Sequence, residues 1–162
     1  MQGLRQLIAS LTLVVRTVAL CAMVAMMFFI FFAVVNRQFI RPVIGDIELV
    51  QLGMVVLIML GLAYTEREKG HISIGLFVDK FPKKLQHVMD CLAYVLTIGV
   101  SSLIAYTYIG VAHEHQHSMR LSTDLLSIPF YPFDWVIVIG FVTWGLEALL
   151  GLIDAVIGLL DA

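Results

Sequence analysis

Charged residues are scarce in this chain: only 14% of its 162 residues are Asp, Glu, Lys or Arg, whereas 60% are hydrophobic. Soluble domains carry about 25% charged residues, so this composition excludes an ordinary soluble fold. The net charge of -2 argues against nucleic acid as an electrostatically attracted partner. The two cysteines, Cys21 and Cys91, form no CxxC pair, so no metal or redox motif arises from them.

Proline is also rare, and the long apolar runs of the sequence contain none. A bilayer core about 30 Å thick requires about 20 apolar residues of helix to cross it. Four runs approach or reach this length, which predicts an all-α integral membrane protein, a single membrane domain over 1–162. We expect the four transmembrane helices at about 12–36, 47–66, 88–112 and 133–153, with Asp134 as the N-cap of the last.

Lys and Arg residues are distributed unevenly between the predicted loops. Seven of the ten lie before the first apolar run, which starts at Thr17, or between the second and third runs. The positive-inside rule therefore places both termini and the middle loop in the cytoplasm. The seven residues are Arg5, Arg16, Arg67, Lys69, Lys80, Lys83 and Lys84.

The middle loop contains an amphipathic pattern. Ile74, Phe77, Val78 and Phe81 recur at i, i+3, i+4 and i+7, which predicts a short helix at about 72–81 lying along the membrane surface. The alternative is a tether whose apolar residues pack on the other helices. Nearby lysines are expected to contact anionic lipid. These interfacial lysines are Lys69, Lys80, Lys83 and Lys84.

Acidic and small polar residues within the apolar runs are functional or packing candidates. Charge is costly at membrane depth, which singles out Glu48 at the start of the second helix and Glu147 in the fourth. We expect Glu147 to reach either interfacial water or a partner chain. Thr97, Ser101 and Ala105 form a small-residue stripe that predicts a packing face on the third helix, without indicating which helix it contacts.

One short motif suggests an enzyme. His113, Glu114 and His117 match HExxH, in which two histidines on one helical face hold zinc and the glutamate activates water. This alternative would make the chain a small membrane metalloprotease. A third ligand is required, and the nearby candidates, Asp124 and His115, fall in no recognisable pattern. Because short motifs match by chance, we predict no metal site and no enzymatic activity.

The histidines raise a second alternative, a haem-bearing membrane anchor subunit. A bis-His haem site needs two histidines on facing helices. All five histidines instead lie in loops or near helix ends, so neither haem nor another cofactor is predicted. They are His71, His87, His113, His115 and His117.

Several short segments occur in the order found in one family. Arg37 follows the first helix and Glu48 opens the second. Further along come Gly61-Leu62-Ala63-Tyr64, Gly70-His71-Ile72-Ser73-Ile74, Phe81-Pro82-Lys83-Lys84 and Ser127-Ile128-Pro129. In order and spacing the chain resembles the small membrane subunit of the tripartite ATP-independent periplasmic (TRAP) transporters, the DctQ-like proteins. It departs from them at Asp46 and Ile47, where family members often carry an aromatic and a second acidic residue.

The resemblance implies a function in transport. In such systems a periplasmic binding protein captures an organic acid, for example a C4-dicarboxylate or sialic acid, and a large multi-helix subunit carries it inward with sodium. The small subunit braces the large one and helps receive the binding protein, so neither sodium nor substrate is expected to bind this chain. The partner-interface or structural candidates are Arg37, Glu48, His71, Asp79 and Glu147.

Overall fold

The computed structural model describes residues 2–68 and 81–160 of the chain, and this part is almost entirely helical. The helices are α1 (Gln2–Phe39), α2 (Asp46–Arg67), α4 (Lys83–Glu114) and α5 (Tyr131–Leu160), and a π-helical turn (His115–Met119) extends α4. All four α-helices are long and apolar enough to cross a membrane. The predicted all-α, four-helix membrane fold is therefore confirmed.

The helices extend beyond the predicted limits. α1 begins at Gln2 rather than near residue 12, and α5 continues to Leu160 rather than ending near residue 153. Hydropathy does not mark the start of α1 because polar residues interrupt it, yet Ile8 and Thr12 are both 1% exposed. Packing of this inner face extends the helix past its most apolar run.

Two other expectations have different outcomes. Asp134 was expected to be the N-cap of the last helix, but α5 begins at Tyr131, so Asp134 lies within its first turn. The proposed surface helix at 72–81 lies outside the described residues, except for Phe81, which is non-helical and directly precedes Pro82.

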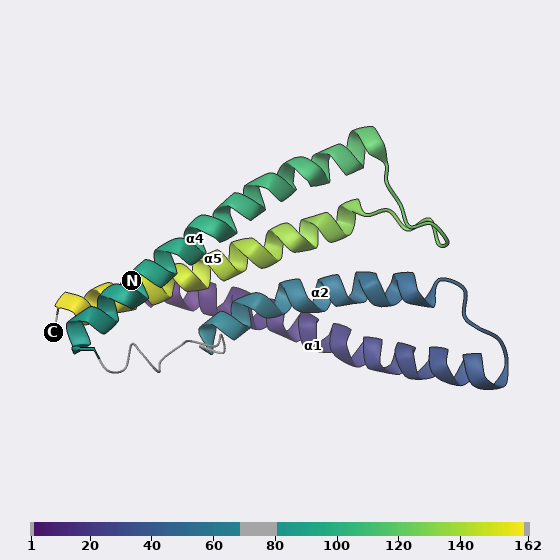
Figure 1. Ribbon diagram of the computed structural model, residues 1–162, viewed down its shortest axis with the longest axis horizontal. Helices are drawn as coiled ribbons and strands as arrows, with labels where there is room; N and C mark the ends of the chain where they lie inside the picture. The colour runs from purple at the N-terminus through teal and green to yellow at the C-terminus, as the bar shows by residue number, and fades with distance from the viewer. Residues whose placement is uncertain (1, 69–80, 161–162) are drawn as a thin grey trace.

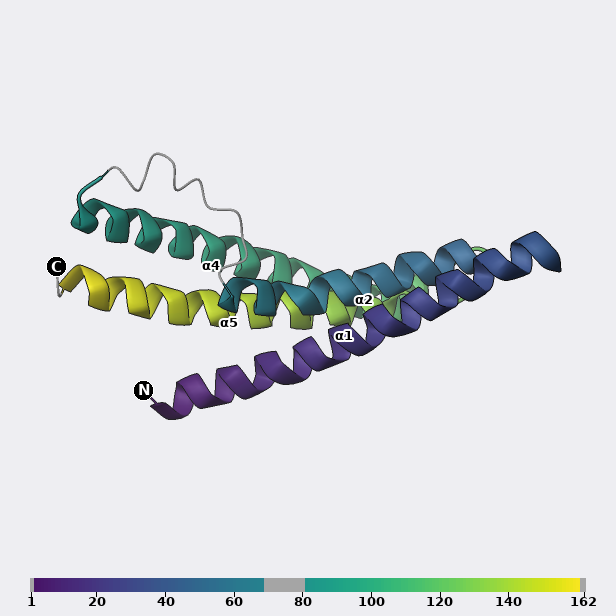
Figure 2. The same ribbon diagram turned by 90° about the horizontal axis from the view of Figure 1, so that it is seen from below.

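The helices pack with α5 in the centre. α5 makes its most extensive contact with α4, a smaller one with α2 and only a small one with α1, while α1 packs mainly against α2. Figure 1 shows the α1–α2 pair and the α4–α5 pair diverging toward one end, and Figure 2 shows α1 and α2 as neighbours from the perpendicular direction. We call this end, which carries the connections 40–45 and 120–130, the loop end; the opposite end carries both chain termini and is called the terminus end.

Small residues on α5 permit these close contacts. A Cβ added to Gly140 would lie 2.5 Å from the carbonyl oxygen of Met59 on α2, so the two backbones almost touch there. One added to Gly145 would lie 2.8 Å from the Oγ of Ser101 on α4. Ser101 and Ala105 are 1% and 5% exposed. Two of the three residues of the predicted packing stripe of α4 are therefore buried, Thr97 is half-buried, and Ser101 meets α5.

The outward surfaces of the edge helices are apolar. α1 and α4 leave large side chains exposed, as expected for surfaces that contact lipid or another membrane protein. Examples are Phe28, Phe31, Leu96, Leu103 and Tyr106.

Candidate functional site

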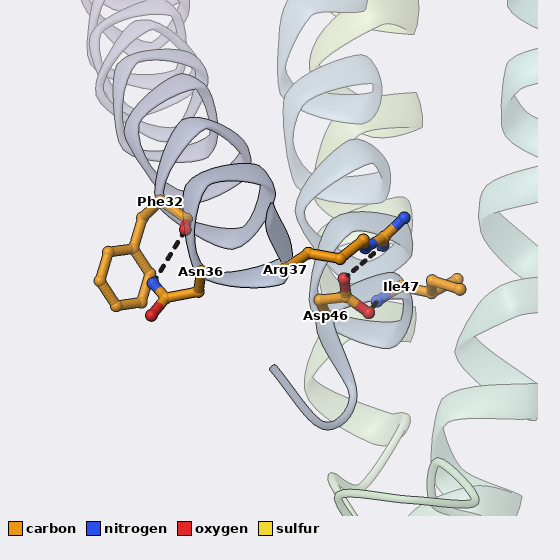
Figure 3. A network of polar contacts seen from close by, with 5 residues as sticks. All are labelled: Phe32, Asn36, Arg37, Asp46 and Ile47. Carbon is orange, nitrogen blue, oxygen red and sulfur yellow. Dashed lines mark hydrogen bonds and ion pairs between the residues drawn. The ribbon is translucent and has the colours of Figure 1, made fainter. Parts of the chain in front are cut away.

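Arg37 joins α1 to the start of α2. Its Nη2 lies 2.9 Å from Oδ2 of Asp46, and the other carboxylate oxygen of Asp46 accepts a hydrogen bond from the backbone N–H of Ile47 at 2.8 Å (Figure 3). An acidic residue in the first turn is also favoured by the helix dipole. Arg37, a candidate site residue, thus takes part in a contact within the chain that fixes the α1–α2 corner. The sequence did not reveal Asp46 as its partner.

Glu48 connects α2 to the segment between α4 and α5. Its two carboxylate oxygens accept hydrogen bonds from the backbone N–H groups of Leu125 and Leu126, at 2.8 and 3.0 Å. Leu126 also lies against Gly45, whose φ of 77° is a left-handed conformation that suits glycine. A Cβ at Gly45 would lie 2.4 Å from the Cγ of Leu126. Glu48 therefore fastens the segment 120–130 to the first turn of α2, and the contact of Leu126 with Gly45 brings this segment against the connection 40–45.

The segment 120–130 has a defined shape of its own. The backbone N–H of Thr123 donates to the carbonyl of Ile128 at 2.9 Å, and the N–H of Ile128 donates to the hydroxyl of Thr123 at 3.1 Å. Ser122 and Pro129 form an isolated antiparallel bridge. This segment is accordingly a compact turn that Glu48 fastens to α2.

His115 and Asp134 form a further polar contact at the loop end. Nδ1 of His115, in the π-helical turn, lies 2.7 Å from Oδ2 of Asp134 in the first turn of α5. Asp134 is 7% exposed, so the imidazole satisfies a carboxylate that is nearly buried. Asp134 does not cap α5, because the helix already begins at Tyr131. Its side chain instead bonds to the π-helical turn that extends α4.

The HExxH residues lie across the end of α4. His113 lies in the last turn of α4, which ends at Glu114, whereas His117 lies in the π-helical turn, where the α-helical spacing is lost. The two rings stack with centroids 5.9 Å apart, and His113 packs edge-on against Trp135. Among the described residues, no group of three His, Cys, Asp or Glu side chains is placed to hold a metal ion.

Glu147 lies in a polar cluster at the terminus-end half of the protein. It is 7% exposed and accepts a hydrogen bond from the hydroxyl of Thr12 on α1. Glu147 therefore has a hydrogen-bond partner within its own chain. Two further contacts cross between helices here: Arg5 pairs with Asp154, and the indole N–H of Trp144 donates to Glu66 at 2.8 Å. Sequence periodicity gave no sign of these pairings.

The remaining candidates belong to the α2–α4 connection. Lys83 and Lys84 are exposed in the first turn of α4. The other predicted residues of this region lie outside the described part of the chain. These are Lys69, His71, Asp79 and Lys80.

The architecture and its polar contacts define a multi-pass membrane protein whose buried polar side chains connect its own helices. In the described residues, every buried side-chain nitrogen and oxygen has a hydrogen-bond partner. The family described as tripartite ATP-independent periplasmic transporters, DctQ component, matches residues 26–158. The chain belongs to this family and is a small membrane subunit of a TRAP transporter, which confirms the resemblance. No curated protein shows significant similarity to the chain.

Membership places the chain in a larger assembly. DctQ proteins work in a tripartite complex with a large permease and a periplasmic binding protein. The family and the four membrane-crossing helices identify a multi-pass protein of the inner membrane. The polar contacts above are therefore the internal framework of one subunit of a transporter.

Proposed function

We propose that this chain braces the large permease subunit of a sodium-coupled transporter for organic acid uptake and helps receive the periplasmic binding protein. The observation that carries this proposal is the arrangement of the helices, with α5 in the centre and α1 and α4 at the edges. The exposed apolar faces of α1 and α4 suit a subunit that lies against a larger membrane protein.

The buried polar groups support a structural role. Thr12 with Glu147 and His115 with Asp134 each join two helices of this chain. Polar groups so engaged hold helices together, because an unsatisfied polar group in the membrane is costly. Sodium and substrate binding accordingly belong to the large subunit in this proposal.

The function is tested by purification and reconstitution. The tagged chain, extracted from its native membrane in mild detergent, is expected to recover the large permease in stoichiometric amount. Liposomes containing both subunits, supplied with the binding protein, should accumulate an organic acid only under an inward sodium gradient. Liposomes containing this chain alone should accumulate none. Recovery of the chain without a large membrane partner would refute the proposal.

We further propose that the terminus end is cytoplasmic and the loop end periplasmic. The support is the charge distribution, because seven of the ten Lys and Arg residues belong to the termini and the α2–α4 connection. A reporter enzyme that works only after export is expected to be active when inserted after Arg41. It should be inactive when fused after Leu85. The reverse pattern would invert the topology.

A further inference from the structure

A pocket of about 460 Å³ opens at the loop end between α2, α5 and the segment 120–130. Its lining includes three acidic side chains, Glu48, Asp124 and Asp134. Leu52 and Val55 of α2 contribute apolar surface deeper along that helix. The pocket thus combines an acidic part near the helix ends with an apolar part within the membrane-crossing helices.

The lining carries more negative than positive charge. No Lys or Arg side chain is among the described residues that line the pocket. His115 is the one basic group there, and it is already bonded to Asp134. Glu48 is bonded to backbone N–H groups, which carry no net charge. Even with His115 protonated, the three carboxylates leave an excess of negative charge that a cation would balance.

Two polar side chains of the lining remain available to a ligand. Asp124 and Gln51 both line the pocket and are exposed, so a carboxylate and an amide are accessible there. Phe130 and Phe133 add aromatic rings, which attract cations. A guanidinium or ammonium group carried on an aliphatic stem matches this combination of acidic, amide and aromatic surface.

We propose that this pocket receives a Lys or Arg side chain of the large permease subunit. The inference rests on the proposed function, because it assigns part of the surface through which the chain braces its partner. The depth of the lining favours a membrane protein over the binding protein. Val55 lies nine residues after Asp46, about 13 Å along the helix at 1.5 Å per residue, so an occupant that reaches it must enter between the helices.

A phospholipid is a poorer occupant of the same pocket. Its acyl chain would suit Leu52 and Val55, but its phosphate would meet three carboxylates and no described Lys or Arg. A basic protein side chain brings the required charge without the phosphate.

The test compares charge changes inside and outside the pocket. Asp124→Lys places a positive charge where the partner's cation would lie, and recovery of the large permease with the tagged chain should fall roughly tenfold or more. Asp124→Asn should cause a smaller loss. Glu114→Lys is the matched control, because Glu114 is an exposed acidic residue at the same end that does not line the pocket. It should leave recovery unchanged.

The outcomes separate this inference from the proposed function. If the unaltered chain does not recover the large permease, both fail. If the unaltered chain and Asp124→Lys recover it equally, the pocket assignment fails while the proposed function stands.

A photo-crosslinking residue in place of Gln51 provides a second measurement that does not depend on the charge variants. An adduct with the large permease is expected, and adducts with the binding protein alone or with lipid alone would overturn the assignment. Thermal unfolding of Asp124→Lys should match that of the unaltered chain, because Asp124 is an exposed residue.

Discussion

Gly140→Ala is expected to destabilise the protein by about 1–3 kcal/mol, as overpacking of a close contact does. The added Cβ would lie 2.5 Å from the oxygen and 2.9 Å from the carbon of the Met59 carbonyl. These are backbone atoms, so no side-chain rotation relieves the contact and α2 must move away from α5. Since α5 contacts α1, α2 and α4, such a shift affects the centre of the structure. Thermal unfolding of the purified chain in detergent measures the effect.

Gly61→Ala is the matched control for this substitution. Gly61 lies on α2, and nothing lies within 4 Å of a Cβ added there. The same chemical change should therefore leave the midpoint of unfolding unchanged or raise it slightly, because alanine favours helix over glycine. Equal midpoints for Gly140→Ala and Gly61→Ala would contradict the close approach of α2 and α5.

Glu48→Ala should release the turn between α4 and α5. The substitution removes both acceptors of the Leu125 and Leu126 N–H groups, so hydrogen exchange at these two amides should accelerate by roughly tenfold or more. Glu48→Gln keeps one acceptor oxygen, so its exchange rate should lie between those of the unaltered chain and of Glu48→Ala. Exchange is measured on the purified chain by mass spectrometry with peptide-level resolution.

The control for Glu48 is Glu114→Ala, which removes an exposed carboxylate at the same end. It should leave exchange of the 120–130 segment unchanged. Should Glu48→Ala show the same protection as the unaltered chain, the internal bonds of the turn, such as those of Thr123, would suffice to hold it. This result would contradict the role of Glu48 in fastening the segment 120–130 to α2.

The sequence predicted the four helices because their apolar runs match the bilayer, a property that each segment carries alone. It did not predict partners, because these depend on how helices meet. Thr12 and Glu147 are 135 residues apart, and no periodicity links them. Asp134 has the residue type and position of an N-cap, yet Tyr131 and Pro132 already begin α5 and its carboxylate bonds His115. The sequence singled out Glu48, because a charged side chain is costly in the membrane. It did not predict the two backbone N–H groups to which Glu48 binds.

The central place of α5 has a consequence for biogenesis. α5 follows the other three helices in the chain, so a ribosome completes α1, α2 and α4 before their shared neighbour has been translated. α4 in particular enters the bilayer ahead of the helix that buries Ser101 and Ala105. Final packing must therefore wait for the last segment to insert, and chains stalled before Tyr131 would leave this small-residue face open to quality-control proteases.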